Sequence, residues 1–71
     1  MDKDFTITYT YGSYGEEADY GENAKGRIPA ADADSARVLA KETLAKFYDW
    51  FFINNVHLTT PRESREVDYM A

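Results

Sequence analysis

The side chains with the clearest chemical potential are acids gathered near the start of the chain. Glu16, Glu17, Asp19 and Glu22 follow one another closely, and no lysine or arginine stands among them. Residues 1–24 hold six acids against the single base Lys3, whereas residues 25–71 hold seven of each sign. The whole net charge of −5 therefore lies in the first third of the chain.

The scarcity of other reactive residue types limits the catalytic and metal sites in which these acids could take part. His57 is the only histidine and there is no cysteine, so a zinc site of nitrogen and sulfur ligands and a thiol nucleophile are both excluded. The acids do not follow the twelve-residue pattern of a calcium loop, and no phosphate-binding loop or nucleophile elbow is present. The sequence predicts a protein that is not an enzyme and holds neither metal nor cofactor.

Tyrosines accompany the acids. Tyr11, Tyr14 and Tyr20 are each followed by a glycine, which would let a partner's backbone approach closely. Tyrosine offers rigid contact area, a polar tip and a ring face on which arginine stacks. An extended chain from Glu16 to Glu22 spans at most about 20 Å, comparable with six nucleotides of one DNA strand. The pattern predicts an anchor for a basic surface, unless the segment is only a solvated loop, and the negative charge disfavours direct nucleic-acid binding.

The first element that positions these residues is a strand, which the alternation of apolar residues and threonines predicts. Phe5–Tyr11 places aromatic and aliphatic side chains on one side and threonines on the other, which predicts a strand of an antiparallel sheet with one face in water. Residues 12–23 form a long hairpin connection. A second strand covers Ala24–Ile28 and ends at Pro29, because proline cannot continue a ladder.

A helix is expected next. Asp32 or Asp34 caps it, a role that explains this acid pair better than a cation site. At helical spacing, one broad face collects the residues Ala36, Leu39, Ala40, Thr43, Leu44, Phe47, Trp50 and Phe51. The pattern predicts about five to six turns that end at Asn54 or Asn55. Val38 and Phe52 fall off this face.

A short third strand follows at Val56–Thr59. The sequence leaves residues 62–71 undecided between an edge strand and a frayed tail. The predicted fold is α+β: a single domain over residues 1–71 with a two-layer ββαβ(β) order, in which one long helix covers one face of an antiparallel sheet.

Size and composition set the broad class. The chain has 71 residues, 44% of them hydrophobic, and its longest apolar run is only Trp50–Ile53. That run is far short of the roughly 20 residues that span a bilayer, and the acidic start is unlike a signal peptide, so a cytoplasmic protein is expected. A core this small rarely supplies more than about 3–5 kcal/mol, so we expect a homodimer or a complex with a partner.

In these respects the chain resembles the small inhibitors made by phages, especially anti-CRISPR proteins. The resemblance rests on size, acidity, the lack of cysteine, the element order and the segment YGSYGEEADYGE at residues 11–22. It implies a non-enzymatic inhibitor, acting in the host cytoplasm, that occupies a basic DNA-binding site through the acids and tyrosines named above. The bases Arg37, Lys41 and Lys46 on the outer helix face depart from an all-acidic DNA mimic. The alternative is a small assembly module that self-associates through Val38, Phe52 and Tyr69.

Overall fold

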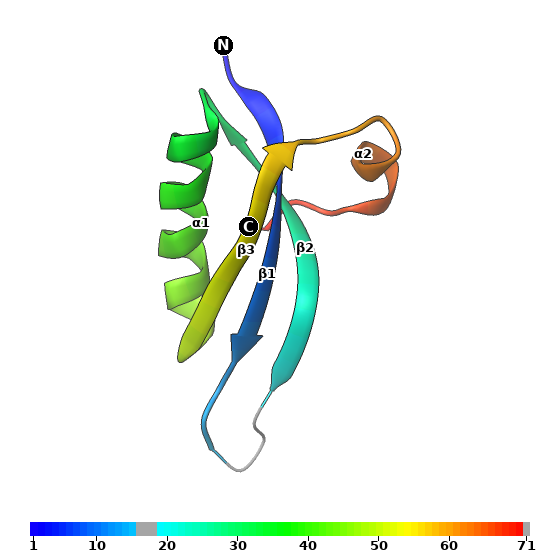
Figure 1. Ribbon diagram of the computed structural model, residues 1–71. Coiled ribbons are helices and arrows are strands. Elements are labelled where there is room, and N and C mark those ends of the chain that lie inside the picture. The colour runs from blue at the N-terminus through cyan, green and yellow to red at the C-terminus, as the bar shows by residue number, and fades with distance from the viewer. Residues whose placement is uncertain (16–18, 71) are drawn as a thin grey trace.

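The computed structural model of the protein describes residues 1–15 and 19–70, which form one sheet with one main helix on it (Figure 1). The elements in chain order are β1 (Lys3–Gly12), β2 (Tyr20–Ala30), α1 (Ala33–Phe47), β3 (Trp50–Leu58) and α2 (Glu63–Glu66). The three strands are antiparallel, with β1 in the middle of the order β2-β1-β3. The expected α+β class, with a helix on one face of an antiparallel sheet, is confirmed.

β1 follows the predicted alternation. Phe5 and Ile7 are buried on the α1 side, where Phe5 lies opposite Ile28 of β2 and Leu58 of β3. Tyr9 continues this side and packs against the core. The expectation that the threonine side faces water is wrong at Thr6, which is completely buried because residues beyond β3 fold over it.

β2 is longer than predicted. It starts at Tyr20, opposite Gly12, and runs through Pro29 to Ala30. Proline is accommodated because β2 is an edge strand, so its missing N–H interrupts no ladder on the outer side. Ser13 N–H donates to the Asp19 carbonyl at 2.9 Å and closes the base of the hairpin connection.

α1 begins where the capping residues predict and ends earlier than expected. Asp32 is the cap, its carboxylate accepting from Ser35 N–H at 2.7 Å. The buried face consists of Ala36, Ala40 and Leu44, whereas Phe47, expected to be buried, is 64% exposed. Small alanines let the helix axis lie close to the sheet.

The predicted extension of the helix to Asn54 or Asn55 is wrong, because Trp50–Leu58 forms β3 instead. A strand here gives the second edge of β1 a partner along almost its whole length, from Phe5–Leu58 to Gly12–Trp50. Pairing in this way satisfies backbone groups that would otherwise remain without partners. The register shifts once, at the step from Thr8 to Tyr9, which leaves Asn54 as an extra residue in β3.

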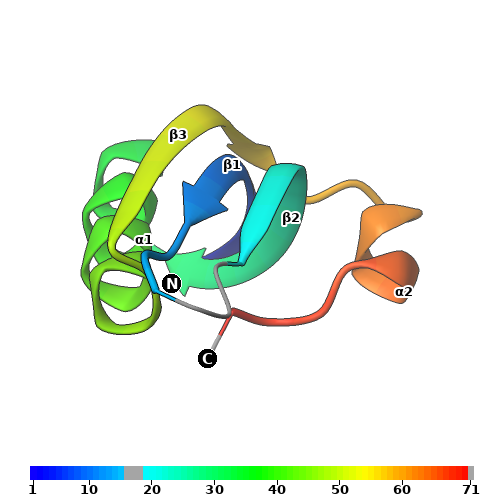
Figure 2. The ribbon, with the colours of Figure 1, turned by 90° about the horizontal axis from the view of Figure 1, so that it is seen from below.

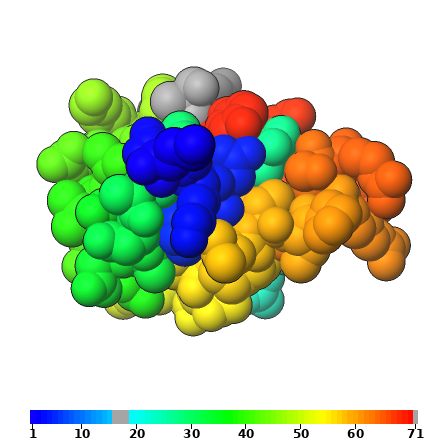
Figure 3. All heavy atoms as spheres, turned by 90° about the horizontal axis from the view of Figure 1, so that it is seen from above, coloured from blue at the N-terminus to red at the C-terminus, as the bar shows by residue number. Residues whose placement is uncertain are grey.

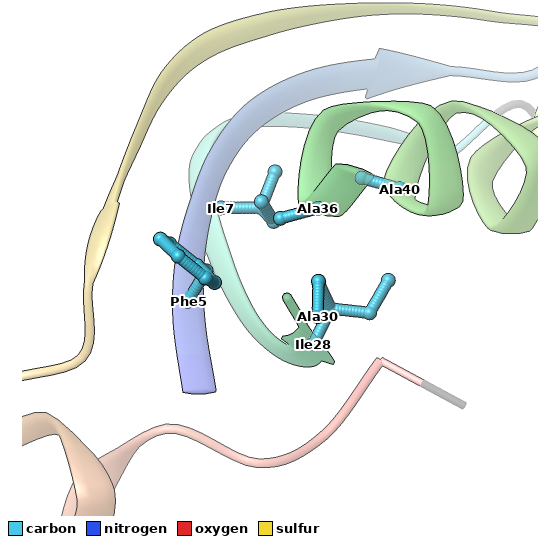
Figure 4. Packing of buried hydrophobic residues seen from close by; sticks show 6 residues of the cluster. All are labelled: Phe5, Ile7, Ile28, Ala30, Ala36 and Ala40. Carbon is cyan, nitrogen blue, oxygen red and sulfur yellow. The ribbon is translucent and has the colours of Figure 1, made fainter. Parts of the chain in front are cut away.

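The hydrophobic core between sheet and helix is small (Figure 4). It contains Phe5, Ile7, Ile28, Ala30, Ala36 and Ala40, with Tyr9, Ile53, Val56 and Met70 packed around it. Large apolar side chains that remain exposed include Phe52 at 65% and Val38 at 55%. Much apolar surface is therefore left on the outside of the molecule.

The segment from Thr59 to Met70, called the strap below, crosses the sheet face opposite α1. Figures 1 and 2 both show α2, within this segment, on the side of the sheet away from α1. The strap returns to the β2 edge, where Arg27 N–H donates to the Asp68 carbonyl at 2.9 Å and Met70 N–H donates to the Arg27 carbonyl at 3.0 Å. The undecided residues 62–71 thus form a four-residue helix and a single parallel bridge at Tyr69, as far as the structure describes them.

Candidate partner-binding surface

The candidate surface lies on the sheet face opposite α1, at the end near the hairpin connection. Trp50 opens β3 directly opposite Gly12 of β1. The indole ring crosses over this glycine so closely that a Cβ atom at position 12 would stand 2.2 Å from ring carbons. Gly12 therefore provides the space through which Trp50 reaches across β1 toward β2.

Three aromatic rings meet at this place. The Tyr20 and Trp50 ring centroids are 5.9 Å apart, and those of Trp50 and Phe52 are 5.8 Å apart. We call Tyr20, Trp50 and Phe52 the aromatic cluster. Tyr20 is 61% exposed and Phe52 is 65% exposed, so the cluster faces solvent. Interplanar angles of 46° and 54° make it a ridged surface instead of a flat platform for stacking bases.

One carboxylate, that of Glu22, borders the aromatic cluster, and two others, those of Asp19 and Asp49, lie near the base of the hairpin connection. Glu22 lies two residues after Tyr20 and accepts a hydrogen bond from its phenol, which raises the pKa of Tyr20 above its ordinary value. Asp49, just before β3, accepts from Tyr14 N–H at 2.6 Å. Asp19 is exposed just before β2, and it lies toward the α1 side, because burial and the charges of Tyr11 and Asp19 raise the pKa of Tyr48 there.

These acids are not neutralised by the rest of the described chain. The ion pairs within residues 1–15 and 19–70 use the acids Asp4, Glu63 and Glu66, and none uses Asp19, Glu22 or Asp49. Their negative charge is therefore directed at solvent, where a cationic partner would meet it.

The site residues predicted from the sequence separate into four groups. Tyr20 and Glu22 lie together in or beside the aromatic cluster, and Asp19 and Tyr14 lie exposed near the hairpin connection. Glu16 and Glu17 lie outside the described residues. Tyr11 is on the opposite side of the sheet, where its ring stacks on that of Tyr48 at 4.1 Å.

Two of the three glycines in the tyrosine–glycine pairs, Gly12 and Gly21, have a different role from the predicted one, whereas the space around Gly15 is open. A Cβ at Gly21 would stand 2.4 Å from the ring of Tyr11, just as one at Gly12 would meet Trp50. These two glycines make room for the chain's own aromatic rings and not for a partner's backbone.

Sequence reasoning missed Trp50, Phe52 and Asp49 as members of this surface. Trp50 was expected in the helix core and Phe52 beside it. Read as a strand, the segment alternates: Trp50 and Phe52 face the side opposite α1, while Phe51 lies across from Tyr11 on the α1 side. That alternation is the signal that could have found them.

The other end of the same sheet face is closed by the strap. His57 Nε2 lies 2.9 Å from both carboxylate oxygens of Glu63, which also accepts from Thr60 N–H at 3.0 Å and from the Thr6 hydroxyl at 3.3 Å. The Thr60 N–H and His57 lower the pKa of Glu63 from 4.5 to about 2. Nδ1 of His57 faces the Asn55 amide at 3.2 Å, so both ring nitrogens have partners and His57 serves to hold the strap.

Arg27 holds the end of the strap. Its Nε donates to the Val67 carbonyl at 2.5 Å, its Nη1 donates to Asp4 at 3.1 Å, and its guanidinium lies 4.2 Å from the centroid of the Tyr69 ring. The Tyr69 hydroxyl also donates to Asp4, at 2.7 Å. Tyr69 thus helps to hold the strap, while 51% of the residue remains exposed to solvent.

Elsewhere the surface is only gently hollowed. A depression of about 360 Å³ is lined by residues such as Lys3, Leu58 and Pro61, and another of about 410 Å³ by Val38 and Leu39. Figure 3 looks onto the end that carries the first of these, where the start of β1 lies between α1 and the residues after β3. No cluster of three potential metal ligands occurs in the described part of the chain. Neither of its helices is long and apolar enough to cross a membrane.

No protein-family model, no curated protein and no solved structure matches this chain. Its function is therefore inferred from the surface itself. The informative features are an exposed aromatic cluster with Glu22 beside it, and acids at the same end of the sheet that form no ion pair within residues 1–15 and 19–70.

Proposed function

We propose that this protein is a non-enzymatic inhibitor that binds a basic, nucleic-acid-binding surface of another protein and excludes the nucleic acid. It binds through the docking end, which we define as Tyr14, Asp19, Tyr20, Glu22, Trp50 and Phe52, together with Glu16 and Glu17 of the connecting segment. The observation that supports this most is the solvent-exposed aromatic cluster with Glu22 at its border.

Two kinds of interaction would act together at the docking end. Aromatic side chains that become desolvated at the centre of an interface supply much of its affinity. Carboxylates around them attract a cationic partner and favour one orientation. Trp50 and Tyr20 also present ring faces on which an arginine of the partner can stack.

A nucleic-acid-binding site fits this chemistry better than other basic surfaces. Such sites carry lysines and arginines spaced for phosphates, and the acids of the docking end are spaced comparably along the chain. The net charge of −5 makes nucleic acid itself an unfavourable ligand. Inhibition of the anti-CRISPR type, in which target DNA is kept from a bacterial recognition complex, is the specific form that we propose.

Affinity capture from a bacterial lysate tests this function. The intact protein is compared with a variant carrying Glu16→Gln, Glu17→Gln, Asp19→Asn and Glu22→Gln. A matched control removes the same number of charges elsewhere, through the exposed substitutions Asp2→Asn, Glu42→Gln, Glu66→Gln and Asp68→Asn. Both variants have the same net charge, so the pair separates local from overall electrostatics.

We expect the intact protein and the matched control to capture a DNA- or RNA-binding protein that the docking-end variant does not. The complex should weaken as salt rises from about 0.1 M to about 1 M, because the screening length falls from about 10 Å to about 3 Å. Added duplex DNA or RNA should displace the inhibitor. Equal capture by both variants, or a partner that still binds nucleic acid when saturated with inhibitor, would contradict the proposal.

A further inference from the structure

The two edges of the sheet differ in whether another segment of the chain covers them. At the β2 edge, the strap makes backbone hydrogen bonds with Arg27 from Asp68 and Met70. Met70 lies so close over Gly26 that a Cβ there would stand 2.2 Å from its Cγ. At the other edge, β3 pairs only with β1 among the described residues. The strap therefore covers the β2 edge only around Arg27, and we call the β3 edge, which has no such cover among the described residues, the open edge.

The open edge lacks the usual protection against pairing. Trp50–Leu58 contains no aspartate, glutamate, lysine, arginine or proline, although 30% of the chain is charged. Natural edge strands use such residues to prevent association with another strand. The one ionisable side chain of β3, His57, is turned to Glu63 of the strap. At nine residues, β3 is a long template for an additional strand.

We propose that β3 pairs antiparallel with β3 of a second copy of this chain, so that two molecules form one continuous six-stranded sheet. A second copy supplies a strand that is equally long and equally free of charge, so no charged side chain is brought onto the edge without a partner. Two-fold symmetry lets the same edge serve on both sides. This inference stands independently of the proposed inhibitory function.

The distribution of charge favours the antiparallel arrangement. The docking end lies at the Trp50 end of β3, because Trp50 and Tyr20 both pair with Gly12. Antiparallel pairing therefore puts the two acidic docking ends at opposite ends of the shared sheet. Nine residues at about 3.3 Å each separate them by about 30 Å. That distance is about three screening lengths at 0.1 M salt, so their repulsion is largely removed.

The strap and Pro29 disfavour growth of such an assembly beyond two molecules. After β3 has paired with its copy, each outer edge of the combined sheet is a β2 edge. That edge is occupied at Arg27 by the strap and carries Pro29, which has no N–H to donate. Addition of further strands at this part of the β2 edge is therefore disfavoured, which favours a dimer over a growing fibre.

Charge substitutions at the middle of β3 test the dimer. Asn55 is exposed, and its side chain contacts only the ring of His57 within the described residues, so Asn55→Asp and Asn55→Lys should both fold. In a symmetric antiparallel pair, the two copies of position 55 lie near each other. Each variant alone should dimerise about tenfold more weakly than the unchanged protein, and an equal mixture of the two should recover dimerisation.

Sedimentation equilibrium over a range of concentrations gives the measurement, with circular dichroism to confirm folding. Val38→Asp, on the exposed side of α1, and the docking-end amide variant should both keep the dimer, which separates this inference from the proposed function. Contacts between labelled and unlabelled copies in a mixed nuclear magnetic resonance sample should connect β3 to β3. A monomer at millimolar concentration, which would leave the edge for another protein, overturns the inference. So does a dimer that neither Asn55 variant weakens.

Discussion

The two ends of the sheet face opposite α1 are built from the same strands, but the strap covers one end and the other end is exposed to solvent. At one end Thr6, Lys25, Arg27 and His57 are met by the strap, and each of these side chains contacts an acid of the chain itself. At the docking end, aromatic rings and acids are exposed to solvent, and none of these acids forms an ion pair within the described residues.

This difference indicates which end is available for binding. Polar groups that satisfy one another gain little from a partner, whereas carboxylates and rings that remain open gain from one. Glu63 and Glu22 illustrate the contrast. Glu63 accepts hydrogen bonds from several groups and has its pKa lowered to about 2, whereas among the described residues Glu22 accepts one from the exposed Tyr20 phenol alone. The four predictions below would sharpen or break the comparison.

The largest effect on stability is expected from Glu63→Ala. It removes the acceptor shared by His57, Thr6 and Thr60, and charged hydrogen bonds of this kind contribute about 2–3 kcal/mol. Urea denaturation should show the loss, and amide exchange should speed up at Met70 but not in the core of α1. If the variant unfolds at the same urea concentration, the strap is not held as described.

Low pH should also weaken the attachment of the strap, because it protonates the Glu63 carboxylate. The effect should be smaller than that of Glu63→Ala, because a protonated carboxyl group still fills the same space. The pKa of Glu63 is lowered from 4.5 to about 2 in the folded protein, so its stabilisation is fully present above pH 4.5 and is lost as pH falls toward about 2. Amide exchange at Met70 measured across this range should rise accordingly. In Glu63→Gln this pH dependence should be absent, and its persistence would assign it to another group.

At the docking end, Gly12→Ala should displace the Trp50 ring. The new Cβ would occupy the space that the indole now fills, so we expect a loss of about 1 kcal/mol of aromatic contact and a red-shifted tryptophan emission. Gly21→Ala is the matched control, because it displaces Tyr11 on the opposite side of the sheet. The same emission shift in both variants would argue against the specific placement of Trp50.

The smallest effect on stability is expected from Phe52→Thr. The ring is 65% exposed and threonine suits a strand, so the free energy of unfolding should change by no more than about 0.5 kcal/mol. Affinity for the captured partner should nevertheless fall at least about tenfold, as is typical of an aromatic anchor. Val38→Ala, which removes a comparably exposed side chain from α1, should leave that affinity unchanged.

Sequence patterns predicted those elements that depend on residues close together in the chain. The alternation in β1 is confirmed, and of the two capping residues predicted, Asp32 or Asp34, the structure has Asp32. The end of the helix was not, because the apolar residues from Phe47 to Ile53 fit helical spacing as well as a strand. The free edge of β1, which lies far away in the sequence, determines that Trp50 begins a strand.

The site was predicted only in part for related reasons. Tyr20 and Glu22 were named from their types, but the approach of Trp50 to Tyr20 depends on a pairing across β1 that no local window contains. The strap was missed because it is polar, has no hydrophobic periodicity and is held by contacts such as Arg27 with Val67. Tyr11 was included among the anchors because its type, and not its side of the sheet, was considered.

The central position of β1 also has a consequence for the order in which the fold forms. β1 and β2 follow one another and can associate as a hairpin, whereas β3 reaches β1 only after the whole of α1 has been made. Pairing between distant segments is slow because a long loop must close first. We expect β3 to dock last, so that a ribosome-bound intermediate exposes one side of β1 until the final strand arrives.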